Sequence, residues 1–364
     1  MRVRTVPAVV GGAVGLLGAA TAAGLTRQRR AVARDRAQIT PRSAATLHAP
    51  PTDRERRVQT DDGVALHTEE VGPADAPLAV LMVHGYALSL QSFVLQRKAI
   101  HDCFGDRVRI VLYDQRSHGR SGRSPASACT IEQLGRDLYG VLDQLVPAGP
   151  VVLVGHSMGG MTIMALAEQH PELFGDRIAA VALINTSSGE LRTVTLGLPG
   201  LLARLRGPVL RGAARNVALV ERGRALGKDL AWVITKRLSF ADPDVPPAVV
   251  AFCTNLIAGT PVDVVADFYP TLMAHDGREG LRGLARCEVL VIGAEHDVLT
   301  PLGHSEALAA ALPHARLVVA PGSGHLLMLE HPGMVDRPLL DLVESAYPAT
   351  AVAAKARTRR AVQR

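Results

Sequence analysis

The chain has 364 residues, of which 48% are hydrophobic and 20% charged, a composition that excludes bulk disorder and predicts a sizeable buried core. Its net charge of +6 is unevenly spread: residues 1–36, 191–237 and 346–364 carry +6, +8 and +5, which leaves −13 on the rest. An acidic body with basic ends argues against a nucleic-acid-binding fold and favours contact with an anionic membrane surface, although an arginine-rich solvated face explains the tail equally well.

The N-terminal 55 residues read as a hydrophobic segment followed by a basic linker. Val6–Leu25 contains no charge, and its twenty residues are long enough to span a bilayer as a helix. The small residues Ala20-Thr-Ala22 also fit the cleavage site of a secretory signal. Arginines from Arg27 to Arg36 favour retention of the following chain in the cytoplasm. We therefore expect an uncleaved membrane anchor with a cytoplasmic body, and export through an N-terminal signal is the alternative.

From residue 56 onward, aliphatic runs alternate with amphipathic stretches, which predicts a mostly parallel sheet flanked by helices. Val58–Thr60 and Val64–Val71 flank Asp61-Asp-Gly63 and predict a hairpin. The later strands are continuous aliphatic runs suited to burial on both faces. They are Leu78–Val83, Val108–Tyr113, Val151–Val154, Ile178–Ile184, Val289–Ile292 and Arg316–Val319. Helices are predicted over Ile131–Leu145, with Thr130 and Gln133 as a capping box, and from Met158.

The alternation stops between Ile184 and Val289, a gap too long for a loop. We interpret residues 187–283 as a mainly helical cap inserted into a core of residues 56–186 and 284–345. Leucines at helical spacing over residues 198–209, with interspersed arginines, predict a helix that packs onto the core or lies on a membrane. The basic tail over residues 346–364 is expected to be disordered.

The sequence Gly155-His-Ser-Met-Gly159 follows a predicted strand and precedes a predicted helix. In such a sharp turn the serine is held in a strained conformation, and glycines two residues away on each side let strand and helix approach. This arrangement exposes the Ser157 hydroxyl above the carboxyl edge of the sheet, where open α/β sheets bind ligands. A glycine-rich nucleotide loop is the rival interpretation, but the phosphate-binding lysine is missing.

A serine nucleophile needs an imidazole base that is oriented by an acid. Asp297 follows the strand Val289–Ile292, and His325 follows the strand Arg316–Val319, so both are expected at the same sheet edge as Ser157. Several rivals are weighed against this pair: Glu295, His296 and His331 near it in sequence, and His156 beside the serine. We expect His156 to pack inside the turn, His331 to begin a surface helix, and His304 and His314 to be solvated.

Five motifs occur in order along the chain. They are His84-Gly85-Tyr86, Asp114–Ser121, Gly-His-Ser157-Met-Gly-Gly, Gly293–Asp297, and Gly-His325 with Glu330-His-Pro332. With these motifs the chain resembles the α/β-hydrolase-fold serine hydrolases over about residues 56–345. The resemblance implies the α/β-hydrolase fold, a triad of Ser157, Asp297 and His325, and an oxyanion hole formed by the backbone N–H groups of Tyr86 and Met158. We expect the Tyr86 side chain to line the pocket and Asp114–Ser121 to brace the site.

No cofactor and no metal site is predicted. The four cysteines, Cys103, Cys129, Cys253 and Cys287, lack metal-binding spacing and are expected to be buried thiols, with a disulfide left open. A serine nucleophile argues against the related dehalogenases and epoxide hydrolases, which attack with aspartate.

We therefore expect an esterase or lipase-like hydrolase that cleaves a carboxylic ester, with an apolar acyl chain favoured, through an acyl-enzyme. Its partners would be a small ester or lipid and a membrane surface, not nucleic acid. The alternatives are a haloperoxidase-like or carbon–carbon bond hydrolase with the same triad, and a non-catalytic ligand-binding protein.

Overall fold

The computed structural model describes residues 26–48, 51–194 and 227–347. Three predictions fall on other residues and lie outside this description: the hydrophobic segment over residues 6–25, the leucine-rich helix over residues 198–209, and almost all of the basic tail.

One eight-stranded sheet, in the order β1-β2-β4-β3-β5-β6-β7-β8, organises the described chain. β1 (Arg54–Gln59) and β2 (Ala65–Val71) form the predicted hairpin and pair antiparallel, as do β2 and β4 (Val108–Tyr113). All other neighbouring strands are parallel. They are β3 (Leu78–Val83), β5 (Val151–His156), β6 (Ile178–Ile184), β7 (Glu288–Ala294) and β8 (Arg316–Ala320). The mostly parallel α/β fold predicted from the aliphatic runs is confirmed.

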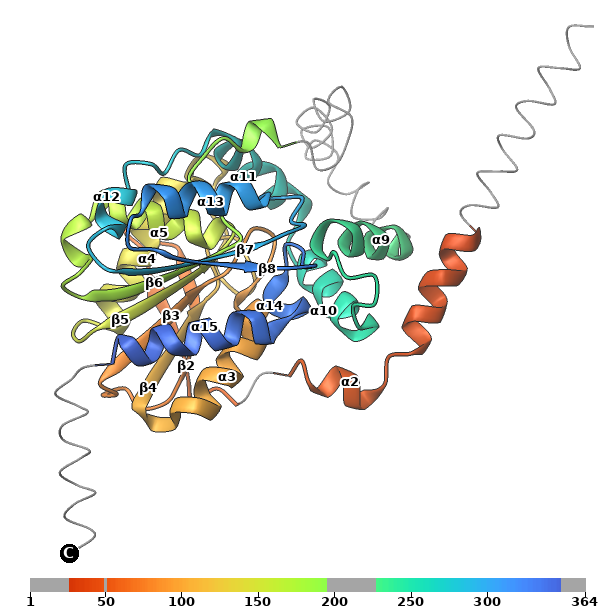
Figure 1. Ribbon diagram of the computed structural model, residues 1–364, viewed down its shortest axis with the longest axis horizontal. Helices are drawn as coiled ribbons and strands as arrows, with labels where there is room; N and C mark the ends of the chain where they lie inside the picture. Colours follow the sequence, from red (N-terminus) through yellow and green to blue (C-terminus); the bar gives the residue numbers. More distant parts are fainter. Residues whose placement is uncertain (1–25, 49–50, 195–226, 348–364) are drawn as a thin grey trace, which may run out of the picture.

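Helices cover both faces of the sheet (Figure 1). α3 (Val94–Phe104) and α15 (Pro332–Ser345) pack on one face, and α4 (Ile131–Leu145), α5 (Met158–Gln169) and α13 (Leu302–Ala311) pack on the other. Successive strand residues point to opposite faces, so Val80 and Met82 of β3 enter the first core, whereas Ala79 and Leu81 enter the second. Burial on both sides explains why β3 is an uninterrupted aliphatic run.

The start of α4 differs in one respect from the predicted capping box. Thr130 caps α4 by accepting a hydrogen bond from the Gln133 N–H at 3.1 Å. The Gln133 amide, however, donates to Asp61 and Asp137, so the reciprocal half of the capping box is not formed among the described residues.

All four cysteines are free thiols, and the expectation of burial is wrong for Cys103, which faces solvent on the outer side of α3.

The chain between β6 and β7 forms the helices that we call the cap helices: α9 (Lys228–Ser239), α10 (Pro247–Ala258) and α11 (Val262–Ala274). The short α12 (Leu281–Leu284) leads back to the sheet. The parallel strands direct their carboxyl ends towards the side of the molecule where α9 and α10 lie (Figure 1).

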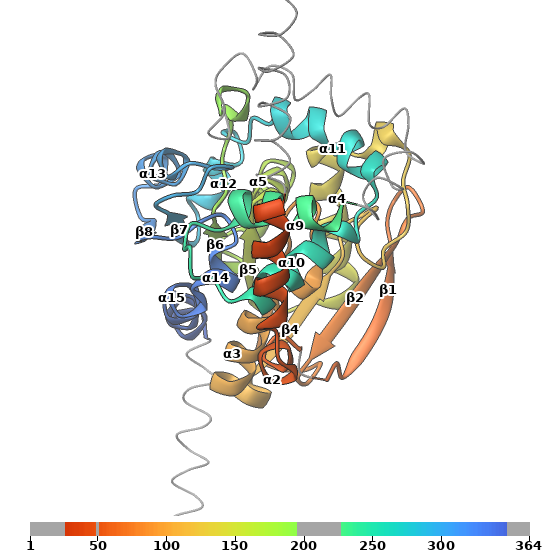
Figure 2. The same cartoon turned by 90° about the vertical axis from the view of Figure 1, so that its right-hand side faces the viewer.

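Part of the predicted linker is a folded element. Residues 26–37 form a helix, and α2 (Pro41–Ala45) follows it. Figure 2 shows this helix lying across α9 and α10. Val32 and Leu47 are 2% and 5% exposed and belong to the same apolar core as Trp232 of α9. The apolar residues of the linker, which are sparse along the sequence, are buried against the cap.

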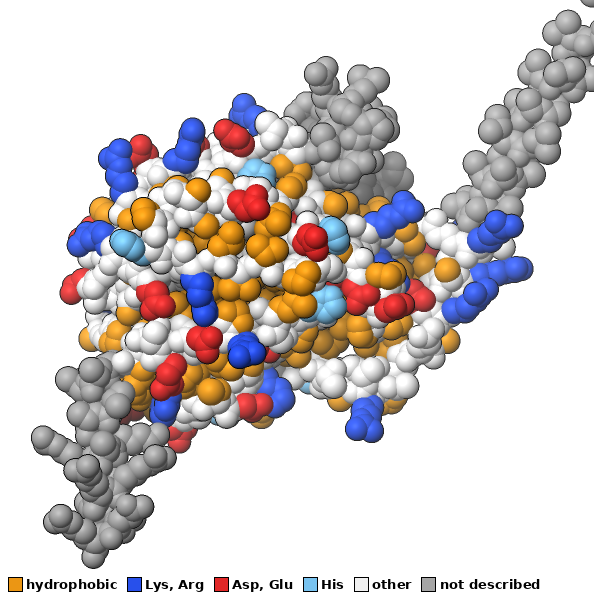
Figure 3. All heavy atoms as spheres, in the orientation of Figure 1, with side chains coloured by type: hydrophobic (Ala, Val, Ile, Leu, Met, Phe, Trp, Pro, Cys, Tyr) orange, Lys and Arg blue, Asp and Glu red, His pale blue; other side chains and the backbone are white. Residues whose placement is uncertain are grey.

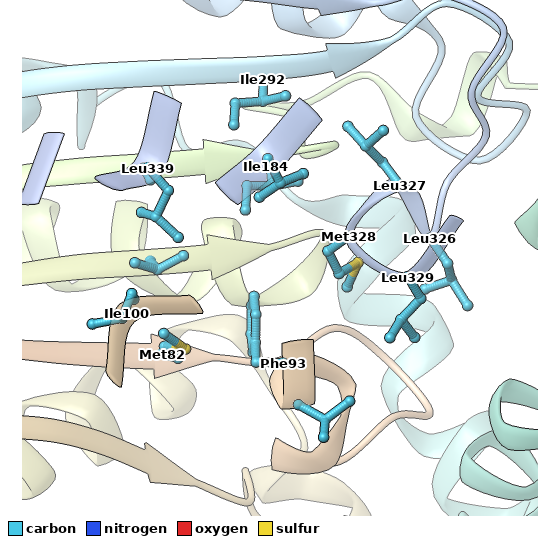
Figure 4. Packing of buried hydrophobic residues seen from close by; sticks show 14 of the residues in the cluster. Met82, Phe93, Ile100, Ile184, Ile292, Leu326, Leu327, Met328, Leu329 and Leu339 are labelled. Carbon is cyan, nitrogen blue, oxygen red and sulfur yellow. The ribbon is translucent and has the colours of Figure 1, made fainter. Parts of the chain in front are cut away.

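The segment directly after His325 is anchored by apolar packing. It forms α14 (Leu327–Glu330), and Figure 4 shows Leu326, Leu327, Met328 and Leu329 in one cluster with Phe93, Ile184 and Ile292. Burial of this segment fixes the loop that carries His325 against the carboxyl ends of β6 and β7.

Candidate active site

Ser157 lies in the turn between β5 and α5, with φ of 53° and ψ of −119°. A positive φ is strained for a residue with a side chain, and here the surrounding glycines allow it. A Cβ atom on Gly155 would lie 2.7 Å from the Gly159 backbone, and one on Gly159 would lie 1.9 Å from the Val83 carbonyl oxygen. The glycines are therefore required by close backbone contact between the turn, β3 and β5.

The loop after β3 passes directly over this turn. A Cβ atom on Gly85 would lie 3.2 Å from the Ser157 Cβ. The backbone N–H groups of Tyr86 and Met158 flank the serine, and neither donates to a backbone carbonyl of the described residues outside helices and strands. An oxyanion hole requires N–H groups without an internal partner, so the assignment of these two groups to one stays a prediction.

Buried polar side chains hold this loop in place. The Ala87 N–H, at a residue with φ of 56°, donates to His118 Nε2 at 3.2 Å, and the Leu90 N–H donates to Asp114 Oδ1 at 2.8 Å. His84 Nε2 accepts from the Gln115 N–H at 2.9 Å. The Asp114–Ser121 segment thus contacts the loop after β3 in the bracing role expected from the sequence.

Asp297 and His325 meet at the carboxyl ends of β7 and β8. His325 Nδ1 lies 2.7 Å from Asp297 Oδ2, and the Asp297 side chain is buried. Because the carboxylate accepts this hydrogen bond, the proton is on Nδ1 and Nε2 is free to take another. Burial raises the pKa of Asp297, but His325 and hydrogen bonds from Thr300 outweigh it and hold this pKa below its ordinary value.

His156, which precedes Ser157 in the chain, contacts His325. The rings of His156 and His325 lie 4.8 Å apart between centroids, and His156 Nε2 lies 3.0 Å from the His325 carbonyl oxygen. No hydrogen bond to the Ser157 hydroxyl is present within the described residues. Such contacts between nucleophile and base are commonly long without substrate and shorten in the Michaelis complex.

Asn185, at the end of β6 with φ of 43°, connects the acid and base loops. Its Nδ2 donates to the carbonyl oxygens of His325 at 2.9 Å and Gly324 at 3.1 Å, and its Oδ1 accepts from the Ala294 N–H at 2.8 Å. Its own carbonyl oxygen lies 2.9 Å from the Thr300 hydroxyl, which is also 2.8 Å from Asp297 Oδ2. Nothing in the sequence signals the role of Asn185, because a polar residue at a strand end carries no distinctive pattern.

Glu330, predicted only as part of the Glu330-His-Pro332 motif, also contacts the loop that carries His325. Its carboxylate accepts from the backbone N–H groups of Ala241 and Asp242 at 2.7 Å each, and of Gly324 at 2.6 Å. One buried carboxylate thereby ties the connection between α9 and α10 to the loop that carries His325.

The rival residues lie elsewhere. His331 precedes α15 as expected, with Nε2 3.8 Å from Asp242, and His296 is an exposed residue beside Glu295. The prediction that His304 is a solvated residue is wrong: it is half-buried, and its Nδ1 lies 2.9 Å from the Ser187 hydroxyl. It faces the chain that leaves β6, a contact between distant segments that its local sequence does not signal.

One acidic cluster has the spacing of a cation site. Carboxylate oxygens of Asp61, Asp62 and Asp137 lie within 4.8 Å of one another. The buried guanidinium of Arg116 already contacts Asp62 at 2.7 Å and Asp137 at 2.6 Å. This arginine supplies the neutralising cation, so we read the cluster as structural.

Comparison with known proteins establishes the family of the fold. The family model of the alpha/beta hydrolase fold matches residues 79–332. The chain belongs to the alpha/beta hydrolase fold family. This hydrolase is 30% identical over 267 residues to a Caulobacter sp. (strain K31) protein named "Putative carbamate hydrolase RutD", and the match covers 73% of this chain and 90% of that one.

Solved structures of the same fold are similar to this hydrolase. An esterase from Thermogutta terrifontis has a TM-score of 0.64 and 24% identity, and it covers 81% of this chain and 100% of its own. A bromoperoxidase from Bacillus anthracis has a TM-score of 0.62 and 21% identity, with 80% and 100% covered. At these identities the similarity establishes the fold alone, so the reaction must be argued from the site.

Proposed function

We propose that this hydrolase cleaves a carboxylic ester through an acyl-enzyme on Ser157. The observation that carries the proposal is the 2.7 Å contact between His325 Nδ1 and the buried Asp297 carboxylate beside the strained serine turn. The Ser157 hydroxyl attacks the ester carbonyl carbon while His325 Nε2 takes its proton, and Asp297 stabilises the resulting imidazolium.

The remaining steps use the same groups. Negative charge on the tetrahedral oxygen is stabilised by the N–H groups of Tyr86 and Met158. The carbon–oxygen bond to the alcohol then breaks as His325 returns its proton to the leaving oxygen. A water molecule, deprotonated by His325, attacks the acyl carbon in the second half, and the products are the free acid and regenerated Ser157.

An apolar acyl chain is supported by what surrounds the serine turn. Met158 and Met161 of α5 belong to a buried apolar cluster with Phe268 and Leu272 of α11, and Tyr86 packs against it. The Tyr86 hydroxyl donates to the Val265 carbonyl oxygen in α11, which fits the expected role of this side chain as part of a wall. Charged acyl groups would lose hydration without a partner beside such a wall.

Hydrolysis of p-nitrophenyl esters across acyl lengths tests the proposal, with an aryl carbamate included because a relative is assigned as a carbamate hydrolase. We expect turnover that rises with acyl length and labelling of Ser157 by a fluorophosphonate. Labelling without hydrolysis of any ester or carbamate would favour the haloperoxidase-like or carbon–carbon bond reactions. A folded protein that is not labelled would favour a ligand-binding role.

A further inference from the structure

The helix over residues 26–37 is fixed to the cap by specific contacts. Arg36 Nη1 lies 2.8 Å from Asp229 Oδ1, Arg36 Nη2 donates to the Lys228 carbonyl oxygen at 3.2 Å, and the guanidinium lies 5.4 Å from the centre of the Trp232 ring. The Asp35 carboxylate lies 3.8 Å from Lys236 Nζ. This helix and α9 are therefore joined at both charged and apolar contacts.

The side of this helix that faces away from the cap is basic. At 100° per residue, Val32, Asp35 and Arg36 share the docked side, whereas Arg27, Arg30 and Arg34 lie on the opposite side. These three arginines are exposed and form no ion pair within the described residues. Figure 3 shows Lys and Arg side chains projecting along the outer edge of this segment. We call Arg27, Arg30 and Arg34 the basic face.

The position of the basic face indicates what it contacts. The helix that carries it lies on the side towards which the parallel strands direct their carboxyl ends (Figure 1), and in the sequence it directly follows the uncharged stretch Val6–Leu25. A row of arginines next to an uncharged segment is electrostatically complementary to anionic lipid headgroups. Within the described residues no single helix is long and apolar enough to cross a membrane, although α10 and α11, bent by 88°, have the necessary combined length and composition.

We propose that Arg27, Arg30 and Arg34 bind the anionic headgroups of a phospholipid bilayer. Because Arg36 fixes the same helix to α9, this contact orients the cap and the carboxyl edge of the sheet relative to the lipid surface. The proposal concerns an interaction surface and does not depend on which bond the enzyme cleaves.

Vesicle flotation with the full-length chain tests the proposal. We expect the parent to bind phosphatidylcholine vesicles that contain phosphatidylglycerol more tightly than pure phosphatidylcholine vesicles, with a difference that added NaCl reduces. The triple variant R27Q/R30Q/R34Q should bind the anionic vesicles roughly 100-fold more weakly, while its binding to neutral vesicles stays the same. Any contribution of the uncharged segment is common to both proteins and cancels.

The matched control is R136Q/R282Q/R337Q, which removes the same charge from α4, α12 and α15. This variant should keep the parental preference for anionic vesicles. Equal binding of the parent to both kinds of vesicle, a triple variant with parental preference, or a control that loses as much would each overturn the proposal. Thermal melting of the triple variant at the parental temperature shows that the helix contacts with α9 survive.

Discussion

His156 Nε2 lies 3.0 Å from the carbonyl oxygen of His325, so the histidine next to the serine contacts the backbone of the predicted base. The carbonyl can only accept, which places the proton on Nε2 and leaves His156 Nδ1 buried without a partner in the described residues. Burial lowers the pKa of His156 to about 3, so this ring is neutral at pH 7 and is not the charged partner of a carboxylate.

His156→Ala should therefore lower stability and reduce kcat modestly, without preventing acylation of Ser157. Loss of the buried ring leaves a cavity and costs on the order of 2–4 kcal/mol of unfolding free energy. Urea unfolding and fluorophosphonate labelling measure the two effects separately. Complete loss of labelling in a folded His156→Ala protein would make His156, not His325, the base.

Asn185 should act as a positioning residue for the acid and base. Asn185→Asp keeps the size and tolerates the positive φ, but it replaces the donating amide with oxygens that face the carbonyl groups of Gly324 and His325. We expect kcat to fall about 100-fold with KM nearly unchanged, because the displaced groups act after binding.

A low-field proton resonance from the hydrogen bond between His325 and Asp297 should shift or broaden in Asn185→Asp, which a purely structural role far from the pair would not cause. Asn255→Asp, on α10, is the control and should leave both kcat and the resonance unchanged. Parental kcat in the Asn185 variant would contradict the positioning role.

Gly159→Ala should be strongly destabilising, whereas Gly303→Ala should not. A Cβ atom at position 159 would lie 1.9 Å from the Val83 carbonyl oxygen, while at position 303, in α13, it meets nothing within 4 Å. Overpacking of backbone against backbone costs on the order of 3 kcal/mol or more, and alanine in a helix gains about 0.5–1 kcal/mol over glycine. Thermal melting should give shifts of opposite sign; a tolerated Gly159→Ala would show that strand and helix can separate.

Stability should fall as the pH drops below about 6.5. Burial lowers the pKa of His84 to about 4, and of His118 and His156 to about 3, so the unfolded chain binds protons that the folded one does not. The stability from these depressed values is present above the unfolded pKa and is lost as pH falls towards 3–4. Each histidine should cost about 2 kcal/mol between pH 7 and pH 5.

Urea unfolding at these two pH values checks this expectation. Between these pH values, His118→Gln should lose about 2 kcal/mol less unfolding free energy than the parent, which is the contribution of one histidine. His314→Gln, at an exposed position, should lose as much unfolding free energy as the parent. A parent that is equally stable at both pH values would contradict the buried neutral state of these rings.

The fold followed from sequence because the central strands β3, β5 and β6 are aliphatic runs that burial on both faces explains, and because Asp61-Asp-Gly63 signals the hairpin of β1 and β2. The serine turn followed because steric contact permits only glycine at residues 155 and 159. Asn185, Thr300 and Glu330 could not be found in this way, since each acts through backbone groups brought together by the folded sheet. The docking of residues 26–37 was missed for a similar reason: Val32 is a single apolar residue in a basic run.

The most direct test compares Ser157→Ala, Asp297→Asn and His325→Ala with the parent in p-nitrophenyl ester hydrolysis, with His331→Ala as the matched histidine control. Residues that act as one catalytic unit lose activity together, so we expect each of the three to reduce kcat by about 10⁴-fold or more. His331→Ala, at a half-buried residue whose Nε2 lies 3.8 Å from Asp242 and not beside Asp297, should keep parental kcat. An active His325→Ala protein, particularly beside an inactive His331→Ala protein, would contradict the proposed site.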